Sequence, residues 1–136
     1  MSTRRFALIF GIVLILLGIA GFIPPLLSPA QGGAIAPGPH HPLLLSMFPV
    51  NPVLNIVHLG LGIWGVITSR QGAGKALLYA RSVAIACAVL WVAGYVPNLD
   101  ILFGLMPIYG NDTWLHVLLA IVAAYFGWVN RSPVES

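Results

Sequence analysis

The stretch FALIFGIVLILLGIAGFI, residues 6–23, decides the fold class of this protein. All of its residues are apolar or glycine, and a helix of this length crosses most of the roughly 30 Å of hydrocarbon in a bilayer. Arg4 and Arg5 stand directly before it, and no charge interrupts it. Residues 6–23 are therefore expected to form a transmembrane helix.

The composition of the whole chain agrees with this expectation. The chain has 136 residues, of which 59% are hydrophobic and only 7% are charged, and its mean hydropathy is +0.96. Soluble domains carry about 25% charged residues, so a soluble enzyme and a disordered chain are excluded. A net charge of +3 on so few charges is too small for a nucleic-acid interface. Cys87, the single cysteine, excludes an internal disulfide and is expected to be a small apolar core residue.

Four apolar runs are long enough to cross a membrane, and they lie near residues 6–23, 53–69, 76–96 and 113–129. The runs are continuously apolar rather than alternating, which favours helices over strands of a membrane barrel. The sequence therefore predicts an all-α membrane protein, with one four-helix transmembrane domain over residues 1–136.

The basic residues indicate the orientation of these helices. They lie before the first run, between the second and third, early in the third, and after the fourth: Arg4, Arg5, Arg70, Lys75, Arg81 and Arg131. All of them fall on one side, which the positive-inside rule makes cytoplasmic. We expect both termini on that side. A cleavable signal peptide ending near Ser28–Ala30 is the alternative for the first run.

The two halves of the chain resemble each other. Residues Ile19–Pro24 end the first run, and residues Val92–Pro97, with matching residue types, end the third. A second match follows in each outer loop, between Leu43–Pro49 and Ile101–Pro107. These loop stretches are too short to span and are expected at the outer membrane surface. The internal match predicts two copies of one helical hairpin.

A histidine follows each loop match by nine residues, His58 in one half and His116 in the other. Two hairpins in series, about residues 1–70 and 71–136, have the same topology. They are expected to be related by a pseudo-two-fold axis along the membrane normal. The two histidines would then lie at the same depth.

Polar and small residues share one face on the second and fourth helices. On the second helix they are Asn55, His58, Gly62, Gly65 and Ser69. On the fourth they are Asp112, His116, Ala120, Ala123 and Gly127. Such faces usually point into a membrane bundle. Because these two helices are diagonal in an up-down bundle, His58 and His116 are expected to face each other.

Three interpretations of His58 and His116 remain open. Each imidazole could form an interhelical hydrogen bond, with Asn55, Asp112 or a backbone carbonyl as its partner. The pair could hold a b-type haem axially, or a transition metal with help from Asp112 or His40-His41. The third interpretation is a polar cavity for a lipid headgroup, a quinone or another amphiphile.

Two apparent motifs have simpler explanations. Gly60–Gly65 spells a dinucleotide fingerprint but lies inside a span, so helix packing is the better interpretation. Gly72–Lys75 resembles the end of a phosphate loop and is expected to be a cytoplasmic turn. The aromatic residues predict an outer belt of Trp91, Tyr95, Tyr109 and Trp114. They predict an inner belt of Phe6, Tyr79 and Trp128.

These residues carry a resemblance to a bacterial family of small four-helix membrane proteins known only as a domain of unknown function. The resemblance rests on Gly21–Pro24, on Asn51–Gly60, and on Asp112 with Leu115-His116. It implies residence in a bacterial inner membrane and a four-helix fold. It implies no activity.

The sequence favours a non-enzymatic function, because it offers no nucleophile–base pair, no carboxylate pair and no charged transport pathway. The leading expectation is a small accessory or scaffolding subunit that forms homo-oligomers or docks onto a larger membrane complex. A haem-, metal- or amphiphile-binding protein that uses His58 and His116 is the first alternative. A small transporter acting as an oligomer is the second.

Overall fold

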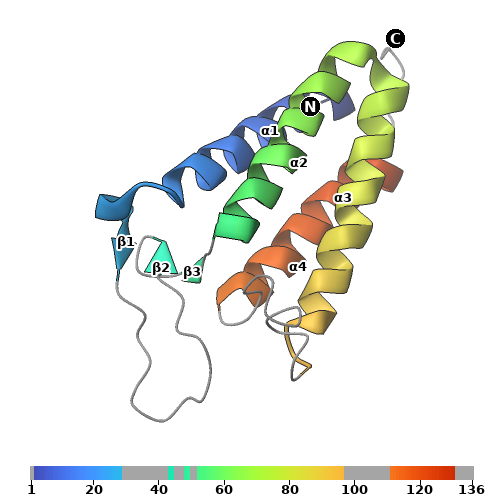
Figure 1. The fold of residues 1–136 in the computed structure, drawn as a ribbon. Coiled ribbons are helices and arrows are strands. Elements are labelled where there is room, and N and C mark those ends of the chain that lie inside the picture. Colours follow the sequence, from blue (N-terminus) through green and yellow to red (C-terminus); the bar gives the residue numbers. More distant parts are fainter. Residues whose placement is uncertain (1, 29–42, 45–47, 50–51, 97–110, 131–136) are drawn as a thin grey trace.

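Four helices pack side by side in the computed structural model, which describes residues 2–28, 43–44, 48–49, 52–96 and 111–130 (Figure 1). They are α1 (Thr3–Ala20), α2 (Pro52–Gln71), α3 (Ala73–Ala93) and α4 (Asn111–Ala124), and α4 continues as the π-helical segment η3 (Tyr125–Val129). Helices α1, α2 and α3 are long and apolar enough to span a membrane, and the apolar helix Thr113–Val129 is shorter. The predicted all-helical class with apolar helices is confirmed.

The first and third helices begin and end three residues earlier than the predicted runs 6–23 and 76–96. In α1 the hydroxyl of Ser2 accepts a hydrogen bond from the backbone N–H of Arg5 at 3.1 Å, so the capped helix starts before the apolar run. It ends at Ala20 with Gly21 as its C-cap, and the chain leaves helical geometry at Ile23, which precedes Pro24. Hydropathy alone does not detect either signal.

The turn between α2 and α3 consists of one residue, Gly72, with a φ of 115°. The sequence predicted a turn over Gly72–Lys75, but Gly74 and Lys75 already belong to α3. Glycine adopts this left-handed φ without a steric penalty from a β-carbon. The two helices can therefore reverse direction within a single residue.

Short extended segments lie at the opposite end of the bundle (Figure 1). A 3-10 turn, η1 (Pro24–Leu26), leads into β1 (Leu27–Ser28), which pairs antiparallel with β2 (Leu43–Leu44). β2 pairs antiparallel with β3 (Phe48–Pro49). The sequence predicted none of these two-residue strands, and the equivalent loop stretch 101–107 lies outside the described residues.

Helices α1 and α2 pack closely because glycines meet where they cross. A β-carbon at Gly62 would lie 2.5 Å from the carbonyl oxygen of Gly11, and one at Gly11 would lie 2.6 Å from that of Gly62. A β-carbon at Gly60 would meet nothing within 4 Å. Two of the glycines in the apparent fingerprint, Gly62 and Gly65, are buried in the bundle, which agrees with the helix-packing interpretation.

An aromatic cluster fills the end of the core near the α2–α3 turn. The rings of Phe6 and Phe126 stack with their centroids 4.7 Å apart, and the hydroxyl of Tyr79 donates to the carbonyl oxygen of Leu61 at 2.9 Å. Phe6 is 2% exposed and Tyr79 is fully buried. Their prediction as members of an inner aromatic belt is therefore wrong, whereas Trp128 is exposed as expected. Interhelical packing explains the difference, because these rings face neighbouring helices.

The two hairpins bury corresponding positions. In α1 the buried set includes Thr3, Phe6, Ala7, Phe10, Gly11 and Leu14. In α3 it is Ala76, Tyr79, Ala80, Val83, Ala84 and Cys87, each 73 residues later. Buried Gly62, Gly65, Thr68 and Ser69 of α2 are likewise followed, 58 residues later, by buried Ala120, Ala123, Phe126 and Gly127. The same separation relates His58 to His116.

In each hairpin, an arginine of the first helix donates a hydrogen bond to the second helix at the end of the bundle near the α2–α3 turn. The Nε of Arg4 donates to the carbonyl oxygen of Ser69 at 2.9 Å, and the Nε of Arg81 donates to that of Gly127 at 2.7 Å. Both carbonyls lie in the last turn of their helix, where backbone acceptors lack helical partners. Cationic donors are favourable at these ends.

Candidate functional site

A small cavity of about 40 Å³ lies at the centre of the bundle, between all four helices. Most of its lining is aliphatic or aromatic: Phe10, Leu14, Leu54, Val57, Leu61, Val83, Leu90 and Leu119. Its remaining lining residues are His58, His116 and Cys87. The cavity is therefore mostly apolar, and His58, His116 and Cys87 are the lining side chains that can bind a metal ion or a polar molecule.

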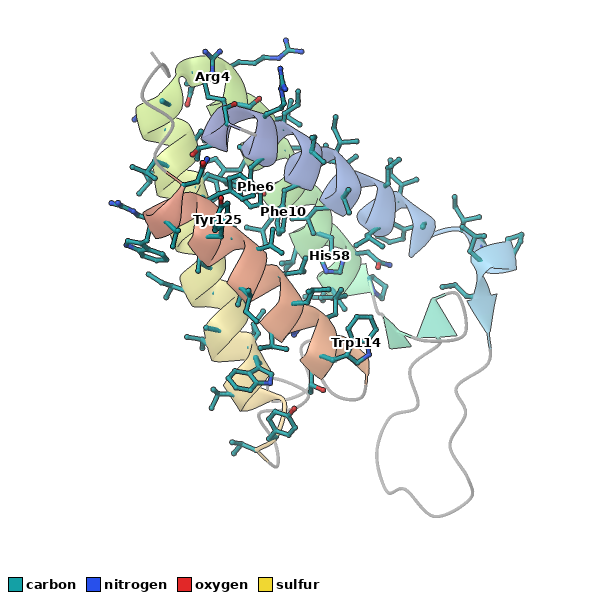
Figure 2. All side chains as sticks on the ribbon, turned by 180° about the vertical axis from the view of Figure 1, so that it is seen from behind. Arg4, Phe6, Phe10, His58, Trp114 and Tyr125 are labelled. Carbon is teal, nitrogen blue, oxygen red and sulfur yellow. The ribbon has the colours of Figure 1, made fainter. Side chains whose placement is uncertain are left out.

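His58 of α2 and His116 of α4 reach this cavity from two different hairpins. His116 is 5% exposed and His58 is half-buried, and Figure 2 shows His58 among the side chains of the bundle interior. The Nδ1 atom of each imidazole is buried and has no hydrogen-bond partner among the described residues. The structure thus brings together the two histidines that the sequence singled out.

Asn55 does not line this cavity, although the sequence grouped it with the histidines. It is 1% exposed and lies against Gly21, at which a β-carbon would collide with the Asn55 side chain. Its Oδ1 atom is buried without a hydrogen-bond partner in the described part of the chain. Asn55 therefore belongs to the contact between α1 and α2. The side chain of Asp112 and the pair His40-His41 lie outside the described residues.

Cys87 is the cavity residue that sequence reasoning did not place in the site. It is 8% exposed, and it was expected only as a small apolar core residue. Cys87 stands 73 residues after Leu14, and both residues line the cavity, so the two hairpins contribute corresponding positions to it. Because only the structure shows that Leu14 lines the cavity, this separation alone could not place the thiol in the site.

The size of the cavity decides between the ligands that the sequence left open. Pockets for drug-sized molecules usually measure about 300–1,000 Å³, so about 40 Å³ accommodates neither a porphyrin nor a quinone headgroup. A single metal ion or a few water molecules fit this volume. Within the described residues, no group of three His, Cys, Asp or Glu side chains is placed to share a metal ion. Two imidazoles are thus the available ligand pair.

The apolar helices, with His58 and His116 lining one cavity between them, define a small helical protein suited to a membrane. A family model described as "Domain of unknown function (DUF4383)" matches residues 4–129. The chain therefore belongs to this family, which confirms the resemblance found in the sequence. No curated protein and no solved structure matches the chain.

Proposed function

We propose that this protein is a non-enzymatic, membrane-embedded binding protein that holds one transition-metal ion between His58 and His116. The observation that carries the proposal is that the imidazoles of His58 and His116, each with a buried Nδ1 atom that has no hydrogen-bond partner among the described residues, line one cavity of about 40 Å³. Neutral imidazole nitrogen is a good ligand for copper and zinc. Leaving a buried acceptor unsatisfied costs about 1–3 kcal/mol, so an occupant that binds both nitrogens stabilises the bundle.

The proposed site lies on a pseudo-two-fold axis that relates the two hairpins and runs along the membrane normal. The corresponding buried positions of α1 and α3 and the two arginine contacts support this relation. Several cavity residues also form corresponding pairs: Phe10 with Val83, Leu14 with Cys87, His58 with His116, and Leu61 with Leu119. A ligand on the axis would contact both imidazoles equivalently.

We place the protein in a bacterial inner membrane with both termini in the cytoplasm. The basic side chains support this orientation, because Arg4, Arg70 and Lys75 lie at the end of the bundle that holds the α2–α3 turn. The positive-inside rule assigns such an end to the cytoplasm. The histidine pair would then lie in the half of the bundle nearer the outer surface.

A metal titration of the purified full-length protein tests the binding function. We expect one copper or zinc ion per chain, measured by elemental analysis after competition with a chelator. Loading should raise the thermal unfolding midpoint, because a ligand at about 100 times its Kd adds about 2.7 kcal/mol of stability. The variants His58→Gln and His116→Gln should lose both effects, and the double variant His40→Gln/His41→Gln serves as the histidine control.

Three results would overturn this proposal. One is unchanged metal binding in the His58→Gln/His116→Gln double variant. Another is a wild-type protein that binds no metal, which would leave only water between the imidazoles. The third is a Soret absorption band in the purified protein that disappears in the histidine variants. This result would show that the histidines bind haem and not a single metal ion.

An accessory or scaffolding subunit is the second candidate function. It is favoured by the broad apolar surface that the helices expose, including Ile9 and Leu16 on α1 and Ile85 and Val89 on α3. Such faces contact either lipid or the helices of a partner. Extraction in a mild detergent should then recover a complex of fixed stoichiometry, whereas a monomer without a partner would exclude this role.

A further inference from the structure

A groove of about 340 Å³ runs along the outer side of the α3–α4 hairpin, away from the histidine cavity. Small residues, Ala84 and Ala88 of α3 and Ala120 and Ala124 of α4, line it, and its lining also includes Trp91 and Trp128. Trp91 lies near the end of α3, and Trp128 lies in η3, near the α2–α3 turn end of the bundle. The groove is therefore an elongated apolar depression with a tryptophan toward each end.

Two of the four groove alanines correspond to larger side chains in the α1–α2 hairpin, whereas Ala84 and Ala120 correspond to the glycines Gly11 and Gly62. Ile15 stands 73 residues before Ala88, and Val66 stands 58 residues before Ala124. Ile15 lies directly over Gly62, since a β-carbon on that glycine would be 2.6 Å from its Cγ1 atom. Alanine at the corresponding position of α3 leaves this space open. The groove is thus a difference between two otherwise similar hairpins.

A cation is fixed beside the Trp128 end of the groove. Arg81 is exposed, its Nε donates to the carbonyl oxygen of Gly127 at 2.7 Å, and its guanidinium lies 5.6 Å from the centre of the Trp128 ring. These two contacts orient the guanidinium before any ligand binds, so less entropy is lost on binding. Its terminal nitrogens are suited to bidentate contacts with a phosphate.

We propose that this groove binds one acyl chain of an anionic phospholipid whose phosphate contacts Arg81. The volume lies within the range of small-molecule sites, and its lining is almost entirely apolar. Basic side chains at the cytoplasmic end of transmembrane helices attract the anionic lipids of that leaflet. This site is separate from the metal site and does not depend on it.

A described helix from a second copy of the chain is a poorer occupant, because it carries no acidic residue at the end where Arg81 lies. Asp112, the acidic residue of the described helices, lies at the start of α4, at the opposite end of that helix from the Gly127 contact of Arg81. Asp100 and Glu135 lie outside the described residues, and Glu135 is therefore included in the test below. Charge complementarity therefore favours a phosphate over a second copy.

Native mass spectrometry of the full chain in mild detergent tests this site. Dioleoyl phosphatidylglycerol and dioleoyl phosphatidylcholine are titrated separately, since they share acyl chains and differ in net charge. We expect the wild type to retain phosphatidylglycerol roughly tenfold better or more, the factor that charge-assisted hydrogen bonds provide. Arg81→Gln should reduce this to the phosphatidylcholine level, whereas the control Arg70→Gln, on α2, should keep the preference.

Variants that fill the groove test the contribution of the acyl-chain contact separately from that of the Arg81 charge. Ala88→Ile, which introduces the residue found at the corresponding position of α1, should weaken retention of both lipids, and Val89→Ile on the exposed face of α3 is its control. Ala124→Val is the second filling variant if Ala88→Ile does not fold. Equal retention of both lipids by the wild type, a preference that survives Arg81→Gln, or no effect of filling would overturn the proposal. A dimer lost in both Arg81→Gln and Glu135→Gln would assign the groove to a second copy instead.

Discussion

Glycines in this chain differ in what a β-carbon would meet, and this difference decides which of them can be replaced. Gly62 faces the backbone of α1, whereas Gly60, two residues earlier on the same helix, faces open space. Gly72 is confined by its backbone angle instead, since its φ of 115° lies in the left-handed region. Gly74, two residues later, lies inside α3 with open space around it. Each restricted glycine thus has an unrestricted neighbour that serves as its control.

Gly62→Ala should destabilise the protein. The new methyl group would approach the carbonyl oxygen of Gly11 to 2.5 Å, so α1 and α2 must separate. Overpacking of this kind costs about 1–3 kcal/mol, and the thermal unfolding midpoint in detergent should fall. Gly60→Ala should leave the midpoint unchanged or raise it, because alanine favours helix. Equal midpoints for the two variants would contradict the close crossing.

Gly72→Ala should destabilise the turn between α2 and α3. The backbone conformation of Gly72, with φ 115° and ψ 171°, is adopted almost exclusively by glycine, and it costs a residue with a β-carbon about 1–3 kcal/mol. The single-residue turn has no neighbour that can absorb the change. Gly74→Ala should instead stabilise α3 by up to about 1 kcal/mol. Chemical unfolding of both variants measures the difference. A neutral Gly72→Ala would show that the turn does not require this backbone angle.

At the scale of elements, a buried tyrosine of α3 contributes to the contact between the two hairpins, beside the stacked rings of Phe6 and Phe126. Tyr79 packs edge-on against Trp64 of α2 with ring centroids 4.9 Å apart, and its hydroxyl donates to the carbonyl oxygen of Leu61 on the same helix. A β-carbon at Gly65 would lie 2.7 Å from this hydroxyl, so the glycine makes room for the tyrosine. The contact between the hairpins is therefore specific in both shape and hydrogen bonding.

Tyr79→Phe should weaken the contact between the hairpins without disturbing its packing. The ring remains, and only the hydrogen bond to Leu61 is lost, which costs about 0.5–1.5 kcal/mol. Tyr79→Phe should therefore lower the thermal unfolding midpoint. Tyr125→Phe should leave the midpoint unchanged, because Tyr125 is 49% exposed. Equal effects of the two substitutions would argue against a structural role for the Tyr79 hydroxyl.

At the scale of the whole molecule, the arginines and the histidines lie at different levels along the bundle. The arginine contacts lie at the end of the bundle that includes the α2–α3 turn, and the histidines lie in its apolar interior. In Figure 2, Arg4 and Trp114 lie toward opposite ends of the bundle. This arrangement agrees with one cytoplasmic and one outer end, which labelling can test directly.

Cysteine labelling in intact cells should reveal the proposed orientation. In a Cys87→Ala background, Gly33→Cys, in the segment that we expect to face outward, should react with a membrane-impermeant maleimide. Gly74→Cys, near the α2–α3 turn, should react only after permeabilisation, because that turn is expected in the cytoplasm. The reverse pattern would contradict the orientation, and labelling at both positions in intact cells would contradict the two-sided arrangement.

The sequence by itself determined the helical class, the four apolar segments and the residues that share a helix face. Helical periodicity is a local property, so the buried stripe from Gly62 to Ser69 and its counterpart from Ala120 to Gly127 could be predicted without a structure. The ends of the helices were harder to predict, because Ser2 and Gly21 cap α1 through backbone hydrogen bonds, which hydropathy does not measure.

Only the tertiary structure decided what the shared faces enclose. Whether Tyr79 faces lipid or the core, and whether Cys87 reaches the same cavity as His58, depends on the rotation and separation of helices distant in sequence. The distance between two helices is short where glycines allow their backbones to touch, as α1 and α2 do at Gly11 and Gly62. The volume that remains between packed side chains is a property of all four helices together, so no single segment could predict a cavity of about 40 Å³.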